Sequence, residues 1–140
     1  MGQYYKICNL DKRQFISPHK FYEGSKLLAF GSSSNGTMFG LAILLADGNN
    51  RGGGDLRSEN PIIGSWAGDR IVIAGDYADE DKFIPETELK KFLETELKNE
   101  KRNLYQWAAA FFKDISEQVK EAMNFGGNYR QGGVNEDRKL

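Results

Sequence analysis

The clearest indication of the fold class is the sequence of residues 62–74, Ile62-Ile63-Gly64-Ser65-Trp66-Ala67-Gly68-Asp69-Arg70-Ile71-Val72-Ile73-Ala74. Two apolar runs of strand length, 62–66 and 70–74, flank the turn 67–69. This pattern predicts two strands joined by a tight turn. The second run has no polar alternation, so we predict that this strand is central in the sheet or buried on both faces.

The chain before this stretch predicts further strands. Residues 3–16 predict a hairpin, because two runs with strand-forming residues flank a polar turn at 11–13. The short apolar run 26–30 is predicted as another strand, since Gly24 and Gly31 bracket it.

Residues 37–46 predict a helix that lies in the core, because apolar side chains surround almost the whole segment. Asn35 or Thr37 is expected to cap its first turn, and Gly48 to follow its last turn in the left-handed conformation. A long polar loop, 47–60, comes next.

The second half of the chain predicts helices. One begins at Pro85, a second covers 103–112, and a third runs from Asp114 to Met123. Because strands precede helices, we predict an α+β domain over residues 1–125, followed by a disordered tail at 126–140. Its sheet is expected to be small and antiparallel, with four or five strands, one buried helix and two or three C-terminal helices.

Composition excludes several classes of function. The net charge of −1 is spread along the 140 residues, which argues against binding to extended nucleic acid. No apolar stretch is long enough to cross a membrane, so we expect a cytoplasmic protein. Cys8 is the only cysteine and is predicted to be a small core residue. His19 is the only histidine, and a pair with Cys8 would be a chance arrangement.

Eleven of the 16 glycines lie between Gly24 and Gly75, and we predict that this region carries the function. The first candidate is the turn from Gly31 to Thr37, where backbone N–H groups at a helix N-terminus would hold phosphate. Gly31 and Gly36 have the spacing of a nucleotide-binding P-loop, but Thr37 stands where that loop needs lysine. The turn therefore predicts anion binding without nucleotide hydrolysis, or a plain helix cap.

The second candidate is the glycine-rich loop 47–57. Asp47 and Asn49 fit a calcium loop, but Arg51 and Ser58 occupy positions where that loop needs ligands. Instead, the glycines would let a sugar-phosphate lie flat, with arginines pairing to its oxygens. A flexible surface loop is the alternative.

The third candidate is the segment 66–77. Trp66 or Tyr77 would stack on a ring, and Arg70 would add a positive charge; a core tryptophan and a surface ion pair are the alternatives. Together the predicted ligand-binding residues are Gly31, Ser32, Ser33, Gly36, Thr37, Arg51, Gly53, Asp55, Arg57, Trp66, Arg70 and Tyr77. They form one site only if the three loops meet. No catalytic residue, cofactor or metal is predicted.

Residues 1–80 resemble a family of short bacterial and phage proteins. The motifs that carry the resemblance are Met1-Gly2-Gln3-Tyr4-Tyr5-Lys6, Asn9-Leu10-Asp11-Lys12, Pro18-His19-Lys20-Phe21, Leu41-Ala42-Ile43-Leu44-Leu45-Ala46-Asp47-Gly48, Arg51-Gly52-Gly53-Gly54-Asp55-Leu56 and Gly64–Tyr77. The resemblance implies a small accessory protein of the bacterial host cytoplasm, plausibly phage-encoded. By analogy, such proteins counter host defence by sequestering a nucleotide signal or blocking a host protein.

Three functions follow as hypotheses. The first is non-enzymatic binding of a phosphate-bearing small molecule. The second is a protein–protein inhibitor or interaction module that uses the aromatic helix at 105–112 or the charged segment 86–102. The third is a phosphoester hydrolase that uses His19 or an aspartate cluster.

Overall fold

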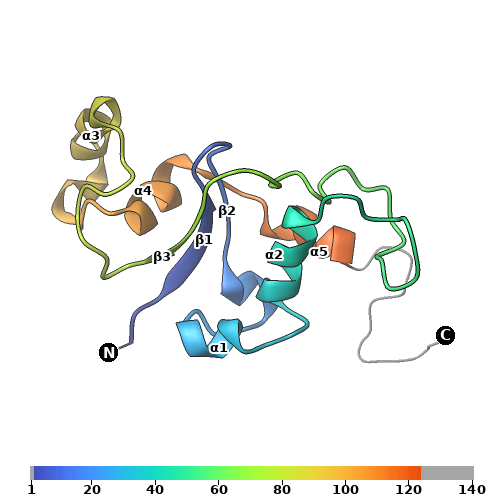
Figure 1. The fold of residues 1–140 in the computed structure, drawn as a ribbon. Coiled ribbons are helices and arrows are strands. Elements are labelled where there is room, and N and C mark those ends of the chain that lie inside the picture. The colour runs from blue at the N-terminus through green and yellow to red at the C-terminus, as the bar shows by residue number, and fades with distance from the viewer. Residues whose placement is uncertain (1, 124–140) are drawn as a thin grey trace.

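The computed structural model describes residues 2–123 (Figure 1). In chain order the elements are β1 (Tyr5–Asn9), β2 (Gln14–Ile16), the 3-10 helix η1 (Pro18–Phe21), α1 (Leu27–Gly31), α2 (Thr37–Leu45), β3 (Ile71–Gly75), α3 (Glu86–Leu93), the 3-10 helix η2 (Glu96–Asn99), α4 (Leu104–Phe111), β4 (Lys113–Asp114) and α5 (Ser116–Met123). This content confirms the predicted α+β class. The predicted tail at 126–140 lies outside the described residues.

The four strands form one sheet in the order β3-β1-β2-β4. β1 pairs antiparallel with β2, as the predicted hairpin requires, and antiparallel with β3. β4 runs parallel to β2, with Lys113 opposite Gln14, so the sheet is mixed and not purely antiparallel. At two residues, β4 is too short for its side chains to show a strand pattern in the sequence.

The sheet separates two cores, because successive side chains of a strand point to opposite faces. Ile7 and Ile16 face the core shared with α1, α2 and α5. Cys8 and Phe15 face the core shared with α3 and α4, on the other side of the strands (Figure 1). Cys8 is fully buried, as predicted, and this burial raises the pKa of its thiol to about 12.

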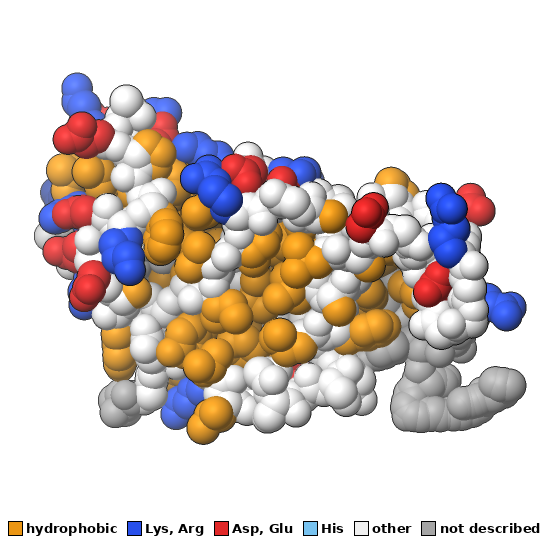
Figure 2. Space-filling view, viewed as in Figure 1, with side chains coloured by type: hydrophobic (Ala, Val, Ile, Leu, Met, Phe, Trp, Pro, Cys, Tyr) orange, Lys and Arg blue, Asp and Glu red, His pale blue; other side chains and the backbone are white. Residues whose placement is uncertain are grey.

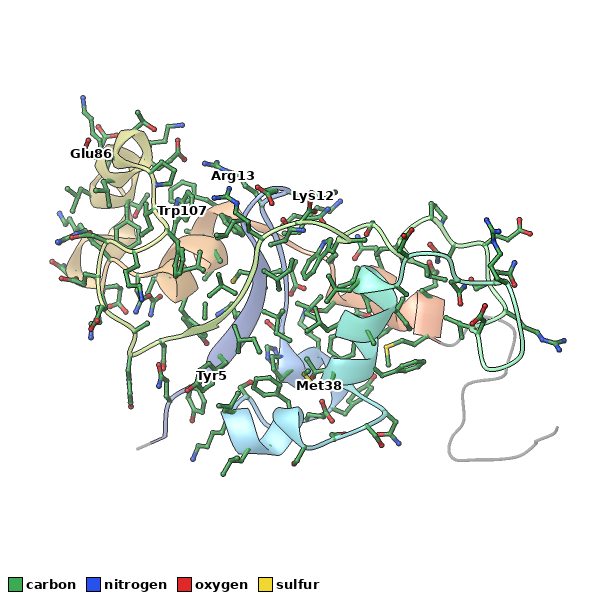
Figure 3. All side chains as sticks on the ribbon, viewed as in Figure 1. Tyr5, Lys12, Arg13, Met38, Glu86 and Trp107 are labelled. Carbon is green, nitrogen blue, oxygen red and sulfur yellow. The ribbon has the colours of Figure 1, made fainter. Side chains whose placement is uncertain are left out.

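Arg13, in the turn between β1 and β2, contacts both α3 and α4 and so links these helices to the sheet. Its Nη2 lies 3.0 Å from Oε1 of Glu88, and its guanidinium carbon lies 5.0 Å from the ring centroid of Trp107. Figure 3 shows Arg13 and Trp107 side by side, with Tyr5 and Met38 on the α1–α2 side.

The segment 26–30, predicted as a strand, belongs instead to the helix α1. A strand would place Leu28 and Phe30 on the same face, because side chains two apart in a strand point the same way. The helix instead buries Phe30 completely, 6.2 Å from the Tyr5 ring centroid, and leaves Leu28 exposed. Five apolar residues carry no period that distinguishes the two structures.

The predicted strand at 62–66 is wrong as well. This segment is a series of turns that covers the C-terminal end of α2. The backbone N–H groups of Gly64 and Trp66 donate to the carbonyls of Ile43 and Leu44, both at 2.9 Å. Those carbonyls lie at a helix end, where the helix itself supplies too few donors. The segment therefore completes α2 and does not pair with the sheet.

α2 forms where predicted but is only partly buried. Ile43 and Leu44 lie in the core, whereas Ala42 and Leu45 are exposed. Gly48 has a positive φ of 96°, but the helix ends at Leu45, so Gly48 lies beyond the cap. The three C-terminal helices α3, α4 and α5 form at the predicted places.

β3 lies at the edge of the sheet and not at its centre. Ile73 is 39% exposed, so the absence of polar alternation did not indicate burial on both faces.

Candidate functional site: the free edge of the sheet

In the predicted phosphate loop before α2, a carboxylate of the protein itself, that of Glu23, occupies the position expected for phosphate. Thr37 donates to Oε1 of Glu23 from its backbone nitrogen at 2.7 Å and from Oγ1 at 2.6 Å. This carboxylate, and not Asn35 or Thr37, caps the helix, because Gly36 at the N-cap has no side chain. A Cβ on Gly36 would collide with the Glu23 carboxylate. The predicted phosphate position is therefore filled.

The first part of the predicted phosphate-binding turn, Gly31, Ser32 and Ser33, is not arranged around an anion site either. Gly31 belongs to the end of α1, and Ser32 Oγ donates to the carbonyl oxygen of Leu28 at 2.6 Å. The serine hydroxyl closes the last turn of α1 and does not point to the start of α2.

The loop 47–60 is braced by its own side chains. Asn49 Oδ1 accepts from the backbone nitrogen of Leu56 at 2.9 Å, and its Nδ2 donates to the carbonyls of Leu56 and Ser58. Oδ2 of Asp55 accepts from the backbone nitrogens of Arg51 at 2.5 Å and of the following glycine at 3.0 Å. These backbone donors lower the pKa of Asp55 below its usual value. The loop is thus organised around an internal carboxylate.

Arg51, Gly53 and Arg57 lie exposed on this loop. Two adjoining hollows, of about 510 and 430 Å³, share Asn50, Ser58 and Glu59 in their walls. Arg57 lines the first and Arg51 the second. Within residues 2–123, neither guanidinium forms an ion pair.

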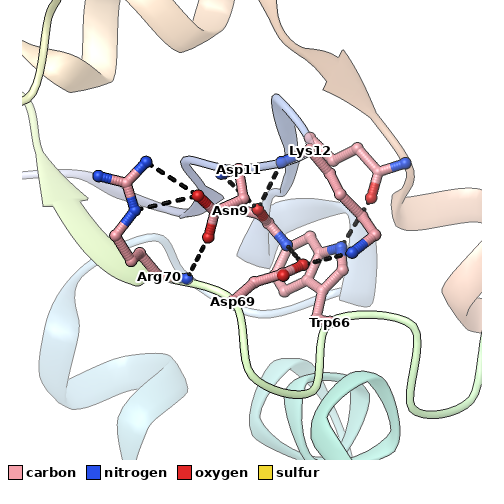
Figure 4. Close-up of polar contacts among 7 residues, drawn as sticks. Asn9, Asp11, Lys12, Trp66, Asp69 and Arg70 are labelled. Carbon is pink, nitrogen blue, oxygen red and sulfur yellow. Dashed lines mark hydrogen bonds and ion pairs between the residues drawn. The ribbon is translucent and has the colours of Figure 1, made fainter.

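The turn that carries Asp69 is tied to the turn between β1 and β2 (Figure 4). The fully buried Asn9 donates from Nδ2 to Oδ2 of Asp69 at 2.8 Å. Its Oδ1 accepts from the backbone nitrogens of Asp11 and Lys12, both at 2.8 Å. The Asn9 amide, together with the Lys12 ammonium 2.5 Å away, lowers the pKa of Asp69.

Trp66 and Arg70 have structural partners in the same place. Trp66 is fully buried, and its Nε1 donates to Oε1 of Gln14 at 2.7 Å. Its ring is therefore unavailable for stacking on a ligand. Arg70 donates to Oδ1 of Asp11 from Nε at 3.0 Å and from Nη2 at 2.8 Å. The pKa of Asp11 is lowered first by the backbone N–H of Arg70 and then by this guanidinium.

The three loops do not meet in one pocket. Residues 31–37 precede α2 and residues 47–57 follow it, so the helix, roughly 13 Å long at nine residues, separates them. Tyr77 follows β3, at the opposite end of that strand from Arg70. The single ligand site predicted from the glycine-rich half is therefore not formed.

Cys8 and His19 do not pair, because Cys8 is fully buried and His19 is exposed on η1. Among residues 2–123, no group of three or more acidic, histidine or cysteine side chains is placed to hold a metal ion. The part of the chain that the structure describes has no helix long and apolar enough to cross a membrane.

The outer edge of β3 presents unpaired backbone groups. Leu10 donates to the carbonyl of Arg70, and Asp76 donates to the carbonyl of Tyr4. In an antiparallel ladder the bonded residues alternate, so the even-numbered residues of β3 face β1. The N–H and C=O groups of Ile71 and Ile73 therefore point outward, and within residues 2–123 they have no hydrogen-bond partner.

A hollow of about 230 Å³ follows this edge. Its walls are Val72–Gly75 of the strand, Leu104 of α4, and four residues of the segment that follows the strand, Ala78, Asp79, Lys82 and Phe83. Phe83 is 49% exposed. Figure 2 shows hydrophobic side chains gathered across the middle of the molecule, with charged groups mainly along its left, upper and right margins. The edge thus combines backbone hydrogen-bonding groups with an apolar surface.

The aromatic helix predicted as a contact surface packs one face into the core, while Ala109 and Ala110 are exposed and Tyr105 and Phe111 are half-buried. Leu104, Trp107 and Ala108 of α4 are buried, and the Trp107 ring packs edge-on against Phe112 with 4.9 Å between centroids. No local sequence signal marks the free edge, because the run 71–75 contains neither proline nor a charge. Charges and prolines are the usual protection of an exposed edge strand.

Comparisons with protein-family models, with curated proteins and with solved structures found no match. The resemblance of residues 1–80 to short bacterial and phage proteins stays a prediction. The motif residues Asn9, Asp11, Trp66, Asp69 and Arg70 all belong to the network in Figure 4. This network gives them a structural role.

Proposed function

We propose that the protein is a protein-interaction module that binds an extended protein segment along the free edge of β3. The observation that carries the proposal is the pair of outward N–H and C=O groups at Ile71 and Ile73 beside an apolar hollow. An added strand would pair with these groups and gain hydrogen bonds that do not depend on its sequence. The side chains of the added strand would alternate between the two faces of the sheet, and the hollow would select those that face it.

The hollow favours apolar side chains in the bound segment. Val72, Ala74 and Leu104 supply apolar walls, while Asp79 and Lys82 stand at its border with opposite charges. Such a site combines backbone pairing for affinity with shape for specificity. It also exposes Ile73 and Phe83, which a bound segment would remove from water.

Ile73→Pro should abolish binding without unfolding the protein. The Ile73 N–H points away from β1, so proline removes a docking donor and leaves the ladder with β1 intact. A phage-displayed random peptide library, selected on the wild type, should yield peptides with apolar residues at alternate positions. Fluorescence anisotropy should show these peptides binding Ile73→Pro at least about tenfold more weakly.

Ile73→Thr is the matched control, because it keeps the β-branched shape and the backbone donor while changing the side-chain chemistry. It should retain most of the affinity. Circular dichroism should show the same fold in all three proteins. A library that yields no binders, or peptides that bind folded Ile73→Pro as tightly as the wild type, would contradict strand addition.

A second candidate function is the binding of a phosphate-bearing small molecule, such as a nucleotide, at the loop 47–60. It is favoured by Arg51 and Arg57, which line adjoining hollows and whose guanidiniums form no ion pair within residues 2–123, although Glu59 lines both hollows as well. Guanidinium groups pair with phosphate oxygens in two-point contacts. The ligand would have to compete with the Asp55 carboxylate for the backbone donors of the loop.

Calorimetry with a panel of nucleotides, cyclic dinucleotides included, tests this candidate. We expect heat of binding with the wild type, and its loss in the double variant Arg51→Ala/Arg57→Ala. Arg70→Ala is the control, since that side chain is held by Asp11 outside the loop. If no heat of binding is detected at tens of micromolar protein, the loop 47–60 does not bind nucleotides with an affinity in that concentration range.

A further inference from the structure

We infer that the segment that occupies the free edge of β3 is β3 of a second copy of this chain, so that two four-stranded sheets join into one. This inference rests on the proposed function, because it names the partner of the same edge. It is drawn from three features of the strand and its flanks: which groups face outward, how the residues match about a two-fold axis, and where the charges lie.

The hydrogen-bonding pattern permits this pairing. A two-fold axis perpendicular to the strand makes the two copies of β3 antiparallel. With the axis at Ile73, Ile73 pairs with its own copy, and Ile71 pairs with Gly75 of the second molecule. The backbone groups of these residues point away from β1, as an antiparallel bonded pair requires. Gly75 is itself buried, with the Gln3 side chain against it, so the Gln3 side chain must move aside where Ile71 of the second molecule pairs with Gly75. The Gly75 carbonyl also accepts from Ala78 at 3.1 Å and retains a second lone pair for the partner.

The charges at the two ends of the strand match in this register. Residues 70–76 read Arg-Ile-Val-Ile-Ala-Gly-Asp, with a positive charge three residues before Ile73 and a negative charge three residues after it. The two-fold axis therefore places Arg70 of each molecule opposite Asp76 of the other, which gives two such pairs. Opposite charges in such cross-strand positions attract, whereas like charges repel.

Both charged side chains keep capacity for this contact. Arg70 is 71% exposed and bonds to Asp11 through Nε and Nη2, which leaves Nη1 available. Asp76 accepts from the backbone nitrogen of Tyr4 through Oδ1, which leaves Oδ2 available. Between the charges, Val72 lies opposite Ala74 of the second molecule, and apolar side chains thus meet apolar side chains.

The strand pair alone buries less area than a stable dimer needs, so surrounding residues must take part. Ile73 is 39% exposed at the axis, and the aromatic rings of Tyr4, Tyr77 and Phe83 are 45%, 52% and 49% exposed. Tyr4 and Tyr77 flank the paired strands at the Asp76 end. The two-fold axis brings that end of each strand to the Arg70 end of the other.

Sedimentation velocity from low to high micromolar protein tests the inference. The wild type should form dimers. Arg70→Asp and Asp76→Arg should each weaken dimerisation by about tenfold or more, because each puts two like-charged pairs across the axis. The double variant Arg70→Asp/Asp76→Arg should restore most of the affinity. Asp11→Asn removes the negative charge that faces Arg70 within the chain but no cross-axis charge, so it should dimerise like the wild type.

Ile73→Pro should be a folded monomer, since proline removes the hydrogen bonds at the axis. A wild type that is monomeric at every concentration overturns the inference; if it still binds selected peptides through the edge, the proposed function stands. A dimer that persists in folded Ile73→Pro overturns the inference, because it would assemble through another surface. If the double variant dimerises no more tightly than the two single charge-reversal variants, the register centred on Ile73 is overturned.

Discussion

Trp66→Ala is expected to lower the free energy of unfolding by about 3–5 kcal/mol, the usual cost of deleting a buried tryptophan. Trp66 is fully buried in the core between the sheet and α2, and its backbone nitrogen also donates to the carbonyl of Leu44. Domains of this size are stable by only about 5–15 kcal/mol, so the variant would lose a large part of its stability. Urea unfolding followed by far-ultraviolet circular dichroism measures the change.

Trp66→Phe separates packing from hydrogen bonding. Phenylalanine keeps an aromatic ring in the core but cannot donate to Oε1 of Gln14, which now accepts from the indole at 2.7 Å. The expected cost is about 1–3 kcal/mol, smaller than for alanine, because it comes from an unpaired acceptor and a modest cavity. An alanine variant as stable as the wild type would show that the segment 62–66 does not hold α2 to the sheet.

Gly64→Ala is expected to destabilise the protein by about 3 kcal/mol, from backbone strain and steric overlap together. Gly64 has a φ of +79°, which side chains other than glycine rarely adopt, and a Cβ would lie 2.5 Å from the carbonyl oxygen of Ala46. That oxygen belongs to the backbone, which cannot move without disturbing the end of α2. Loss of the bond from Gly64 to Ile43 would follow.

Gly68→Ala is the matched control for Gly64→Ala. Gly68 has a similar φ of +86°, but no heavy atom lies within 4 Å of a Cβ built there. Its substitution therefore adds backbone strain alone, at about 1 kcal/mol. Thermal or urea unfolding of both variants gives the difference. Equal costs at the two positions would contradict the close packing of 62–66 on α2.

Elements with a clear local signal could be predicted from the sequence. The hairpin at 3–16 and the helices at 86–93, 104–111 and 116–123 form because turn residues, caps and apolar spacing agree locally. Asn103, for example, accepts from the backbone nitrogen of Gln106 at 3.1 Å and begins α4 as a helix cap. In contrast, the short apolar run at 26–30 fits a strand and a helix equally well.

The predicted ligand site failed for a different reason. Glycine-rich turns indicate where a backbone anion site can form, but not which anion fills it. Glu23 lies 14 residues before Thr37 and yet supplies the carboxylate at the start of α2. Asp55 does the same for the loop 47–60. Glu23 acts through a tertiary contact, which no spacing rule in the sequence describes. Asp55 acts locally, on backbone nitrogens three and four residues before it, in a loop that also offers other carboxylates and backbone donors.

The α+β class, the hairpin, most helices and the burial of Cys8 follow from local sequence patterns, because propensity and apolar spacing act over a few residues. The edge position of 71–75, the contact of 62–66 with the end of α2 and the core position of Trp66 depend instead on how distant segments pack. A strand lies at an edge because no other strand pairs with one of its sides, and this is a property of the folded chain as a whole. The outward N–H of Ile73 depends on the position of the whole chain, and the local sequence Ile-Val-Ile is compatible with a central strand as well as with an edge strand.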